Sequence, residues 1–406
     1  MAGFYTIDDL PALQNAAMGR RVILRADLNV PMGDGTVSDA TRIERLAPTI
    51  AELAAKGFRV VVISHFGRPG GKRDATLSLA PITGALQAAI GSPVIFVAAC
   101  IGTEAEAAVG GLGVGGVALM ENLRFQPGEE ANDHEFARAL ARLGDIYVND
   151  AFSVAHRAHA STEALARLLP AAAGRLMQAE LEALAAALET PKRPVLAVIG
   201  GAKVSTKLDL LANLVAKVDV LMVAGAMANT FLHALGTDVA ASLCEPDMAP
   251  NVREVMARAD GAGCEIALPS DVVVASAFEE GADCETVPIA AVPPGAMILD
   301  VGVETAAALV ARLEDCRTLL WNGPLGAFET PPFDASTVTF ARAAAARTTA
   351  GRLISVAGGG DTMAVLTRAG VIDDLTFVST AGGAFLEWLE GKALPGVKAL
   401  EASKGG

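Results

Sequence analysis

Short runs of Val, Ile and Leu recur along the chain, and the intervals between them are long enough to hold a helix. In the first half we expect strands at residues 20–29, 59–66, 93–99, 116–122 and 145–150. In the second half we expect strands at 195–200, 219–225, 265–269, 296–302, 318–323, 352–360 and 376–380. Nearly continuous apolar runs separated by helix-length segments are typical of βα units in a parallel sheet. The pattern predicts an α/β protein with two doubly wound, Rossmann-like parallel sheets.

A helix-forming segment separates the two series of strands. Residues 176–190 are rich in Ala, Leu and Glu at helical spacing, and Pro191 and Pro194 follow them. At 406 residues the chain is also too long for one core, because single cores stop growing near roughly 250–300 residues. We expect two domains joined by an interdomain helix and a hinge. The expected parts are 1–175, 176–190, 191–390 and a tail at 391–406.

The formal charge narrows the possible partners. The net charge is −14 at pH 7, and a field of that sign repels polyanions, so neither nucleic acid nor an anionic membrane is expected as a partner. Residues 1–175 hold 16 Lys+Arg and 18 Asp+Glu, which leaves 16 and 28 for the rest of the chain. Four of the five histidines also lie in this first part. An anion site is therefore expected in the first half.

The cysteines and the N-terminal residues indicate the compartment. The five cysteines are widely spaced and form no C-x-x-C pair, which is typical of reduced thiols inside a cell. The first ten residues lack the basic and apolar regions of a signal peptide. The apolar stretch 214–236 is interrupted by Lys217, Asp219 and His233, so it is no candidate for a membrane span. The sequence predicts a soluble, cytoplasmic protein.

Polar side chains follow the predicted strands of the first half, at the edge where an open parallel sheet binds its ligands. Asp27 and Asn29 follow the first strand, and both are costly to bury without partners. The remaining polar residues at this edge are cations and imidazoles, namely Arg42, His65, Arg68, Arg124, His156, Arg157 and His159. Any one of these arginines alone is more typical of a solvated surface. Gathered together, planar guanidinium groups match carboxylate and phosphate, so the cluster predicts a site for a small, highly anionic molecule.

Two glycine-rich segments of the second half point to phosphate binding. GGAKVSTK places Lys203 and Lys207 between a strand and a helix start, where backbone N–H groups favour phosphate. AGGGDT supplies three glycines beside Asp361 and Thr362, and a carboxylate next to nucleotide phosphates is a Mg²⁺ ligand. These segments predict a nucleotide-phosphate site.

A third segment, STAGGAFLEW, again puts glycines at a helix start with Gly382 and Gly383. Each of the three segments, taken alone, is equally consistent with an ordinary strand-to-helix turn. None has the spacing of a Walker A motif or of G-x-G-x-x-G. An anion site in one half and a phosphate site in the other favour transfer between two bound molecules.

The chain resembles the phosphoglycerate kinases through motifs that occur in the same order. These are RADLNVP, SHFGRP, ENLRF, YVNDAFSVAHRAHAS, GGAKVSTK, WNGPLGAFE, GGGDT and LEGKALPGV. The resemblance extends over nearly the whole chain. It implies reversible phosphoryl transfer between 1,3-bisphosphoglycerate and ADP, giving 3-phosphoglycerate and ATP, with Mg²⁺, in a monomer whose tail returns to the N-terminal domain.

The resemblance also implies a role for individual residues. Those that match the family's 3-phosphoglycerate site are Asp27, Leu28, Asn29, Arg42, His65, Phe66, Gly67, Arg68, Arg124 and Arg157. Those that match its nucleotide site are Gly201, Lys203, Lys207, Gly225, Gly302, Asn322, Pro324, Glu329, Gly358, Gly359, Gly360, Asp361 and Thr362, with Gly382 and Gly383 in a phosphate loop. Arg42 and Lys203 match the pair near the transferred group, Glu329 is expected near the ribose, and Asp361 is expected on Mg²⁺. Because these sites belong to different domains, we expect closure to precede chemistry.

The expected mechanism needs no general base, because the phosphoryl acceptor is a carboxylate that is ionised at neutral pH. A dehydrogenase is disfavoured because G-x-G-x-x-G is absent after an early strand. A catalytically silent scaffold or sensor is the alternative, but such a relative should have lost Arg42, Lys203 or Asp361.

Three alanines depart from the glycine-rich pattern of the family. Ala224, Ala226 and Ala381 each add a methyl group where backbone is expected to approach a ligand. Such a methyl group either tightens the wall around the adenine or weakens a phosphate contact.

Overall fold

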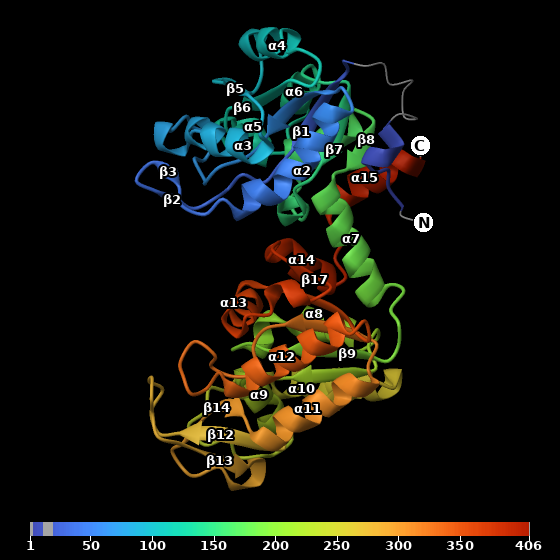
Figure 1. Ribbon diagram of the computed structural model, residues 1–406. Helices are drawn as coiled ribbons and strands as arrows, with labels where there is room; N and C mark the ends of the chain where they lie inside the picture. Colours follow the sequence, from blue (N-terminus) through green and yellow to red (C-terminus); the bar gives the residue numbers. More distant parts are fainter. Residues whose placement is uncertain (1–2, 11–18, 406) are drawn as a thin grey trace. The chain divides into compact units, whose positions relative to one another are not determined.

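The computed structural model describes residues 3–10 and 19–405, and it divides into two compact units (Figure 1). Unit 1 comprises Met1–Glu182 and Ala393–Gly406, and unit 2 comprises Ala183–Lys392. Helix α7 (Arg175–Leu188) contains the boundary between them. The segment expected as a helix at 176–190 is therefore helical, with ends shifted by one or two residues.

Unit 1 is built on a six-stranded sheet in which every pairing is parallel. The order is β5-β6-β4-β1-β7-β8, so the chain turns from one side of β1 to the other. The strands are β1 (Arg21–Arg25), β4 (Arg59–Ile63), β5 (Val94–Val97), β6 (Val117–Met120), β7 (Ile146–Asn149) and β8 (Ala171–Ala173). A reversal of this kind opens a crevice beyond the carboxyl ends of the central strands, where ligands bind.

The helices of unit 1 follow from the apolar spacing of their sequences. Ile43, Leu46, Ile50 and Leu53 recur on one side of α2 and are buried in the core beside β1 and β4. The helices of the unit are α2 (Thr41–Ala55), α3 (Thr83–Ile90), α4 (Thr103–Gly110), α5 (Pro127–Glu130), α6 (His134–Ala141) and α15 (Pro395–Gly405). A small hairpin of β2 (Met32–Gly33) and β3 (Thr36–Val37) follows β1. Because α2 follows β1 and this hairpin in the chain, it begins close to the ligand edge of the sheet.

Two elements of unit 1 hold the ends of the chain. Strand β8, which the apolar pattern did not reveal, consists of three buried alanines. Its first residue donates its backbone N–H to the Ser403 side chain of α15 at 3.0 Å. Lys404 of the same helix donates to the Phe4 carbonyl at 3.1 Å and lies over the Tyr5 ring. The C-terminal segment therefore packs beside the N-terminal segment in unit 1 (Figure 1).

Unit 2 contains a second six-stranded parallel sheet, in the order β11-β10-β9-β15-β16-β17. Its strands are β9 (Val195–Ile199), β10 (Val220–Val223), β11 (Glu265–Ala267), β15 (Thr318–Asn322), β16 (Ile354–Gly358) and β17 (Phe377–Ser379). Its helices are α8 (Leu208–Leu214), α9 (Ala226–Ala234), α10 (Ala249–Ala262), α11 (Val303–Asp315), α12 (Ala335–Thr349), α13 (Gly360–Ala369) and α14 (Gly383–Leu389). The Trp321 ring of β15 meets Phe340 of α12 edge-on in the core. The predicted α/β class with two parallel sheets is confirmed.

One predicted strand pairs differently from the expectation. Strand β14 (Met297–Val301) was expected in the second parallel sheet, but it lies in a separate antiparallel sheet with β12 (Asp271–Ala275) and β13 (Cys284–Pro288). This sheet has its own small core around Val272 and Val274. An apolar run shows that a strand forms, but not which neighbour it pairs with, because the two pairings bury similar side chains. The small sheet supplies one wall of the site described below.

Candidate active site

The loop after β1 is joined to helix α2 by polar contacts. Arg42 donates to the Asp27 carboxylate at 3.0 Å and to the Asn29 carbonyl at 2.9 Å. Ser153 donates to the same carboxylate at 2.6 Å. The amide oxygen of Asn29 accepts from the Gly67 N–H at 3.0 Å. The predicted residues on these segments therefore do come together, and Arg42 keeps 40% of its side chain exposed for a ligand.

The loop after β4 is held by the neighbouring strand end. The Asn122 side chain accepts from the N–H groups of Phe66 and Arg124 and donates to the Phe66 and Leu77 carbonyls. Gly67 has a left-handed backbone with φ of 59°, a conformation that favours glycine. Arg124 is buried, donates to the Gly67 carbonyl at 2.6 Å and lies 3.1 Å from Glu130. These contacts fix one guanidinium of the cluster against the β4 loop.

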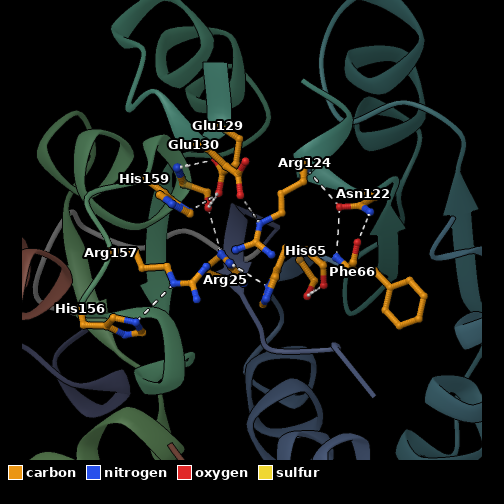
Figure 2. A network of polar contacts seen from close by, with 12 residues as sticks. Arg25, His65, Phe66, Asn122, Arg124, Glu129, Glu130, His156, Arg157 and His159 are labelled. Atoms are coloured by element: carbon orange, nitrogen blue, oxygen red, sulfur yellow. Dashed lines mark hydrogen bonds and ion pairs between the residues drawn. The ribbon is translucent and has the colours of Figure 1, made fainter. Parts of the chain in front are cut away.

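The centre of the cluster is Arg25, which the sequence analysis did not single out (Figure 2). This arginine ends β1 and is fully buried. Its Nε donates to the Ser161 hydroxyl at 2.9 Å, and its Nη2 lies 3.3 Å from Nδ1 of His65. The signal was present in the sequence, because a charged residue at the end of an apolar strand needs partners just as Asp27 does.

A buried carboxylate lies behind this arginine. Glu129 is fully buried and accepts from the Ser161 N–H at 3.0 Å and from its hydroxyl at 2.6 Å. Burial raises the pKa of Glu129, although the nearby Arg25 guanidinium opposes that shift. Ser161 thus connects a carboxylate to a guanidinium, and His159 lies 3.9 Å from the same carboxylate (Figure 2). The hydrogen bonds of Ser161 to Arg25 and to Glu129 therefore hold the Arg25 guanidinium group in one orientation.

Two histidines of the cluster, His65 and His159, are neutral at pH 7. Burial, together with the guanidinium groups of Arg25, Arg124 and Arg157, holds the pKa of His65 well below its usual value. Burial and the same three arginines lower the pKa of His159 to about 4. The positive charge at this edge therefore comes from guanidinium groups, while the imidazoles serve as hydrogen-bonding groups.

The other predicted residues of this site differ in exposure. Arg68 is exposed, and Arg157 is half-buried with its Nε donating to His156 at 3.3 Å. Leu28 is fully buried in the core, so only its backbone can face a ligand. The arrangement as a whole suits a small molecule with several negative charges.

Unit 2 contains a cavity of about 380 Å³ beyond the carboxyl ends of its strands. This volume lies in the range of small-molecule sites. The lining residues are Gly201, Ala202, Gly225, Ala226, Ala228, Asn229, Leu243, Pro269, Val272, Phe278, Met297, Ile298, Leu299, Asp300, Val301, Pro324, Leu325, Gly326, Ala327, Phe328, Glu329 and Asp361. Five predicted nucleotide residues, Gly201, Gly225, Pro324, Glu329 and Asp361, are therefore brought to one cavity.

Comparison with known proteins identifies the family. The family model for phosphoglycerate kinase matches residues 13–392. This chain is a member of the phosphoglycerate kinase family.

Curated relatives and solved structures agree. A phosphoglycerate kinase of Methylorubrum extorquens (strain PA1) is 60% identical over 99% of this chain and its own full length. One of Ruegeria sp. (strain TM1040) is 60% identical over 98% of this chain and its full length. The solved phosphoglycerate kinase of Coxiella burnetii is 41% identical, covers 98% of both chains and has a TM-score of 0.89. That of Pyrococcus horikoshii OT3 is 29% identical over 98% of this chain and 99% of its own, with a TM-score of 0.78.

Several predicted nucleotide residues of this phosphoglycerate kinase family member lie outside the cavity lining and hold its loops. Lys207 donates to the Gly200 carbonyl at 2.6 Å and to the Asn322 amide oxygen at 2.7 Å. Asn322 in turn donates to the Gly358 carbonyl at 2.7 Å. Burial lowers the pKa of Lys207 to about 8. The ammonium group of Lys207 thus connects the ends of β9 and β15, and the Asn322 amide extends the link to β16.

The loop after β16 is fixed by close packing. The Thr362 hydroxyl donates to the Gly358 carbonyl and accepts from the Gly323 N–H at 2.7 Å. A Cβ on Gly358 would lie 2.6 Å from the Phe385 ring, and one on Gly359 would lie 2.7 Å from Nδ2 of Asn322. These glycines are required by the approach of their neighbours. Gly360 begins α13, so the N–H groups of this turn point towards the end of the sheet.

The remaining predicted residues are three glycines at helix starts and one lysine on a loop. Gly302 precedes α11 and packs directly on the Asp271 carboxylate, while its neighbour Val301 lines the cavity. Gly382 and Gly383 stand at the start of α14. Lys203 is exposed on the loop after β9. None of these four residues lines the cavity as the described part of the chain forms it.

The sequence analysis missed the cavity wall and two buried polar side chains. Leu243, Phe278 and Met297 form part of an apolar wall. Asp300 accepts from the Val301 N–H at 2.8 Å and from the Ser336 N–H at 3.2 Å, and burial raises its pKa to about 7. The second buried polar residue is Asn229. Motif spacing gives no signal for this wall, because its residues come from segments that the antiparallel sheet and α9 bring together.

Proposed function

We propose that this enzyme transfers a phosphoryl group between 1,3-bisphosphoglycerate and ADP, giving 3-phosphoglycerate and ATP, with unit 1 binding the glycerate and unit 2 the nucleotide. The observation that carries this division of labour is the contrast between the two sites. Unit 1 gathers buried guanidinium groups around neutral imidazoles. Unit 2 offers an apolar cavity with acidic side chains at Glu329 and Asp361. A compact polyanion suits the first and a nucleoside with phosphates at its rim suits the second.

In unit 1, the glycerate is bound by groups at the strand ends. Arg124 and Arg157 supply charge to phosphate or carboxylate, and Arg25 keeps His65 in place. Asp27 and Asn29 supply acceptors for a hydroxyl group. Leu28, Phe66, Gly67 and Arg68 complete this proposed site. The acceptor carboxylate is ionised at neutral pH, so the residues here bind and orient it and need not remove a proton.

In unit 2, the base and ribose occupy the cavity and the phosphates extend along the loop that begins α13. Glu329, exposed at the cavity, is the proposed ribose partner. Lys207, Asn322 and Thr362 keep the phosphate-facing loops in place. Gly302, Gly382 and Gly383 belong to the same proposed site through their helix starts.

The residues present fit a Mg²⁺ ion that travels with the nucleotide. Mg²⁺ in such enzymes takes one or two carboxylates, with phosphate oxygens and water as its other ligands. Asp361 is an exposed carboxylate in the first turn of α13 and lines the cavity. Within residues 3–10 and 19–405, no group of three or more His, Cys, Asp or Glu side chains is placed to hold a metal by itself. Asp361 would hold the ion, which would supply positive charge next to the nucleotide phosphates.

Arg42 and Lys203 are the proposed catalytic residues, because both are exposed cations next to the respective sites. Their role is to stabilise the charge of the transferring phosphoryl group. We also propose that the enzyme is a cytoplasmic monomer, on the basis of the scattered cysteines and the sequence resemblance. No helix in the described part of the chain is long and apolar enough to cross a membrane. No finding supports the alternative of a silent scaffold or sensor.

A coupled turnover assay with 3-phosphoglycerate and MgATP tests the role of Arg42. Arg42→Ala should lower kcat by on the order of 10³- to 10⁵-fold, the usual cost of losing such a cation. Arg45→Ala removes the same charge from the same helix and should leave kcat near the native value. If Arg42→Ala remained within about tenfold of the native enzyme, or about 1.4 kcal/mol, the assignment of Arg42 would be wrong.

A further inference from the structure

The cavity of unit 2 offers few polar side chains to a base. Its lining contains four, which are Asn229, Asp300, Glu329 and Asp361. Glu329 and Asp361 are exposed, while Asn229 and Asp300 are almost fully buried. Of these four side chains, the buried pair is the candidate for contact with the part of a ligand that enters the apolar interior.

Both carboxylate oxygens of Asp300 already accept hydrogen bonds from backbone N–H groups of the chain. One oxygen accepts from the Val301 N–H and the other accepts from the Ser336 N–H. A Cβ on Gly326 would also lie 2.3 Å from its Oδ1, so the backbone of a lining residue presses against this carboxylate. Asp300 therefore braces the wall of the cavity.

Asn229 differs because only one end of its side-chain amide makes a hydrogen bond. Its Nδ2 donates to the Leu243 carbonyl at 3.1 Å, whereas its Oδ1 is buried and accepts no hydrogen bond from the described residues. A buried polar group without a partner costs roughly 1–3 kcal/mol, so such groups generally have a ligand or water as partner. Asn229 also lies one helical turn after Ala226 in α9, and both line the cavity.

The contact with Leu243 fixes which end of the amide is free. Exchanging the amide oxygen and nitrogen would place the oxygen of Asn229 against the Leu243 carbonyl, which is also an acceptor. The atom without a partner is thus an acceptor, and it favours a ligand that has a hydrogen-bond donor at this position. Among purines, adenine carries a donor amine at position 6, whereas hypoxanthine and guanine carry an acceptor oxygen there.

We propose that Asn229 is a specificity-determining residue that accepts a hydrogen bond from the 6-amino group of adenine. This inference rests on the proposed function, because it places the base of the nucleotide in the cavity of unit 2. The rest of the lining discriminates by shape, since its remaining buried side chains are apolar or, for Asp300, already bonded within the chain. Asn229 is then the side chain that distinguishes the purines.

The test compares ADP with purine riboside 5′-diphosphate, which lacks the 6-amino group and adds no bulk. Binding to the full-length chain is measured by calorimetry in the presence of Mg²⁺. The native protein should bind ADP about 2- to 10-fold more tightly, the range expected for one neutral hydrogen bond. In Asn229→Leu, a variant of similar size, the two diphosphates should bind equally. The quantity compared is the ratio of the two dissociation constants for one protein. A general weakening of the cavity affects both constants alike and leaves their ratio unchanged.

A matched substitution controls for effects outside the cavity. Asn213 also donates its amide to a backbone carbonyl, that of Leu389, but it does not line the cavity. Asn213→Leu should retain the native ratio. The native measurement also stands alone: if the unmodified protein bound the two diphosphates equally, the proposal would be overturned even if Asn229→Leu failed to fold.

The outcomes separate this inference from the function on which it rests. Turnover of 3-phosphoglycerate with MgATP, together with an ADP preference that persists in Asn229→Leu, would overturn only the role of Asn229. Absence of both turnover and nucleotide binding would overturn the proposed function and this inference with it. Turnover provides a second readout, because the ratio of kcat/KM for ATP to that for ITP should fall in Asn229→Leu.

Discussion

At the scale of single residues, burial decides what each ionisable group can do. In unit 1, burial and the neighbouring guanidinium groups both lower the pKa of His65 and of His159, so these two rings are neutral near pH 7. In unit 2, burial acts on Lys207 and on Asp300, and it favours the neutral form of each. The two sites thus differ in the charge that they present to a ligand near neutral pH.

Lys207 predicts a pH dependence of nucleotide binding. Burial lowers the pKa of this lysine to about 8, so it is protonated at pH 7 and largely neutral at pH 9. The charged form favours phosphate, and MgADP should therefore bind up to about tenfold more weakly at pH 9 than at pH 7. Calorimetry at the two pH values measures this difference. Lys207→Gln should remove most of it, whereas an undiminished pH effect in that variant would assign it to another group.

Recognisable motifs in the sequence identified side chains that the fold brings together. Asp27, Asn29 and Arg42 were singled out and lie in contact. Arg25 was missed although a charged residue at the end of an apolar strand is itself a signal, and its partner Ser161 lies far along the chain. Asn229 was missed because its role depends on the folded contact with Leu243. An unpaired amide oxygen is a property of the folded cavity, and no sequence pattern encodes it.

At the scale of secondary-structure elements, charged groups of unit 1 bind the first turn of α7. The Asp150 carboxylate accepts from the Leu176 and Met177 N–H groups at 2.7 and 3.1 Å, so it caps the first turn. Arg175 at the start of this helix is paired with both Asp8 and Glu52 at 2.6–2.7 Å. The first turn of α7 is therefore anchored by one buried carboxylate and one paired guanidinium.

The capping carboxylate predicts a pH-dependent stability. Burial raises the pKa of Asp150 to about 6, above its unfolded value of 3.8. The folded state therefore holds this proton more tightly, and the contribution of Asp150 to stability falls as pH rises from about 4 to 6. Asp150→Asn keeps an acceptor for both N–H groups without the charge. Chemical denaturation measures the free energy of unfolding at pH 4.5 and at pH 7.5. Between these two pH values the variant should lose less of it than the native chain, by about 1–3 kcal/mol.

Asp145→Asn is the matched control, because the pKa of Asp145 is lowered through its hydrogen bonds and ion pair with Arg21. That carboxylate stabilises the fold above its unfolded pKa and loses its contribution as pH falls. Its replacement should therefore cost stability at pH 7.5 more than at pH 4.5. A common pH response of the two variants would contradict the account of Asp150.

Element prediction from the apolar pattern was accurate for the long strands of both parallel sheets. It missed β8, whose alanines have no β-branched signal, and also β12 and β13, and it assigned β14 to the wrong sheet. The antiparallel neighbour of β14 is β12, which begins at Asp271, and the Asp271 carboxylate accepts from the Glu304 and Thr305 N–H groups at the start of α11. Such a tertiary contact selects one strand pairing over another, and local hydrophobicity does not report it.

At the scale of the whole molecule, the two units differ in the side chains of their candidate sites, and each unit has its own core. The tail residues 393–406 belong to unit 1, although they follow unit 2 in the chain. The assignment of one ligand to each unit predicts that each ligand alone stabilises its own unit, because binding to a folded state protects it from opening.

Hydrogen exchange with either ligand alone measures this assignment. 3-Phosphoglycerate should slow exchange in peptides that carry the ends of β1, β4 and β6. MgADP should slow exchange in peptides that carry the starts of α9 and α13. Protection of unit 1 alone by MgADP would contradict the division of function between the units.

The central claim is that the chain is a working kinase in which Lys203 stabilises the transferring phosphoryl group. The most direct measurement is coupled turnover of 3-phosphoglycerate with MgATP by the native chain, by Lys203→Ala and by Lys192→Ala, which removes an exposed lysine elsewhere in unit 2. The account predicts turnover by the native chain and by Lys192→Ala, with kcat of Lys203→Ala lower by on the order of 10³-fold or more. Absence of native turnover, or a Lys203→Ala enzyme within about tenfold of the native one, would contradict it.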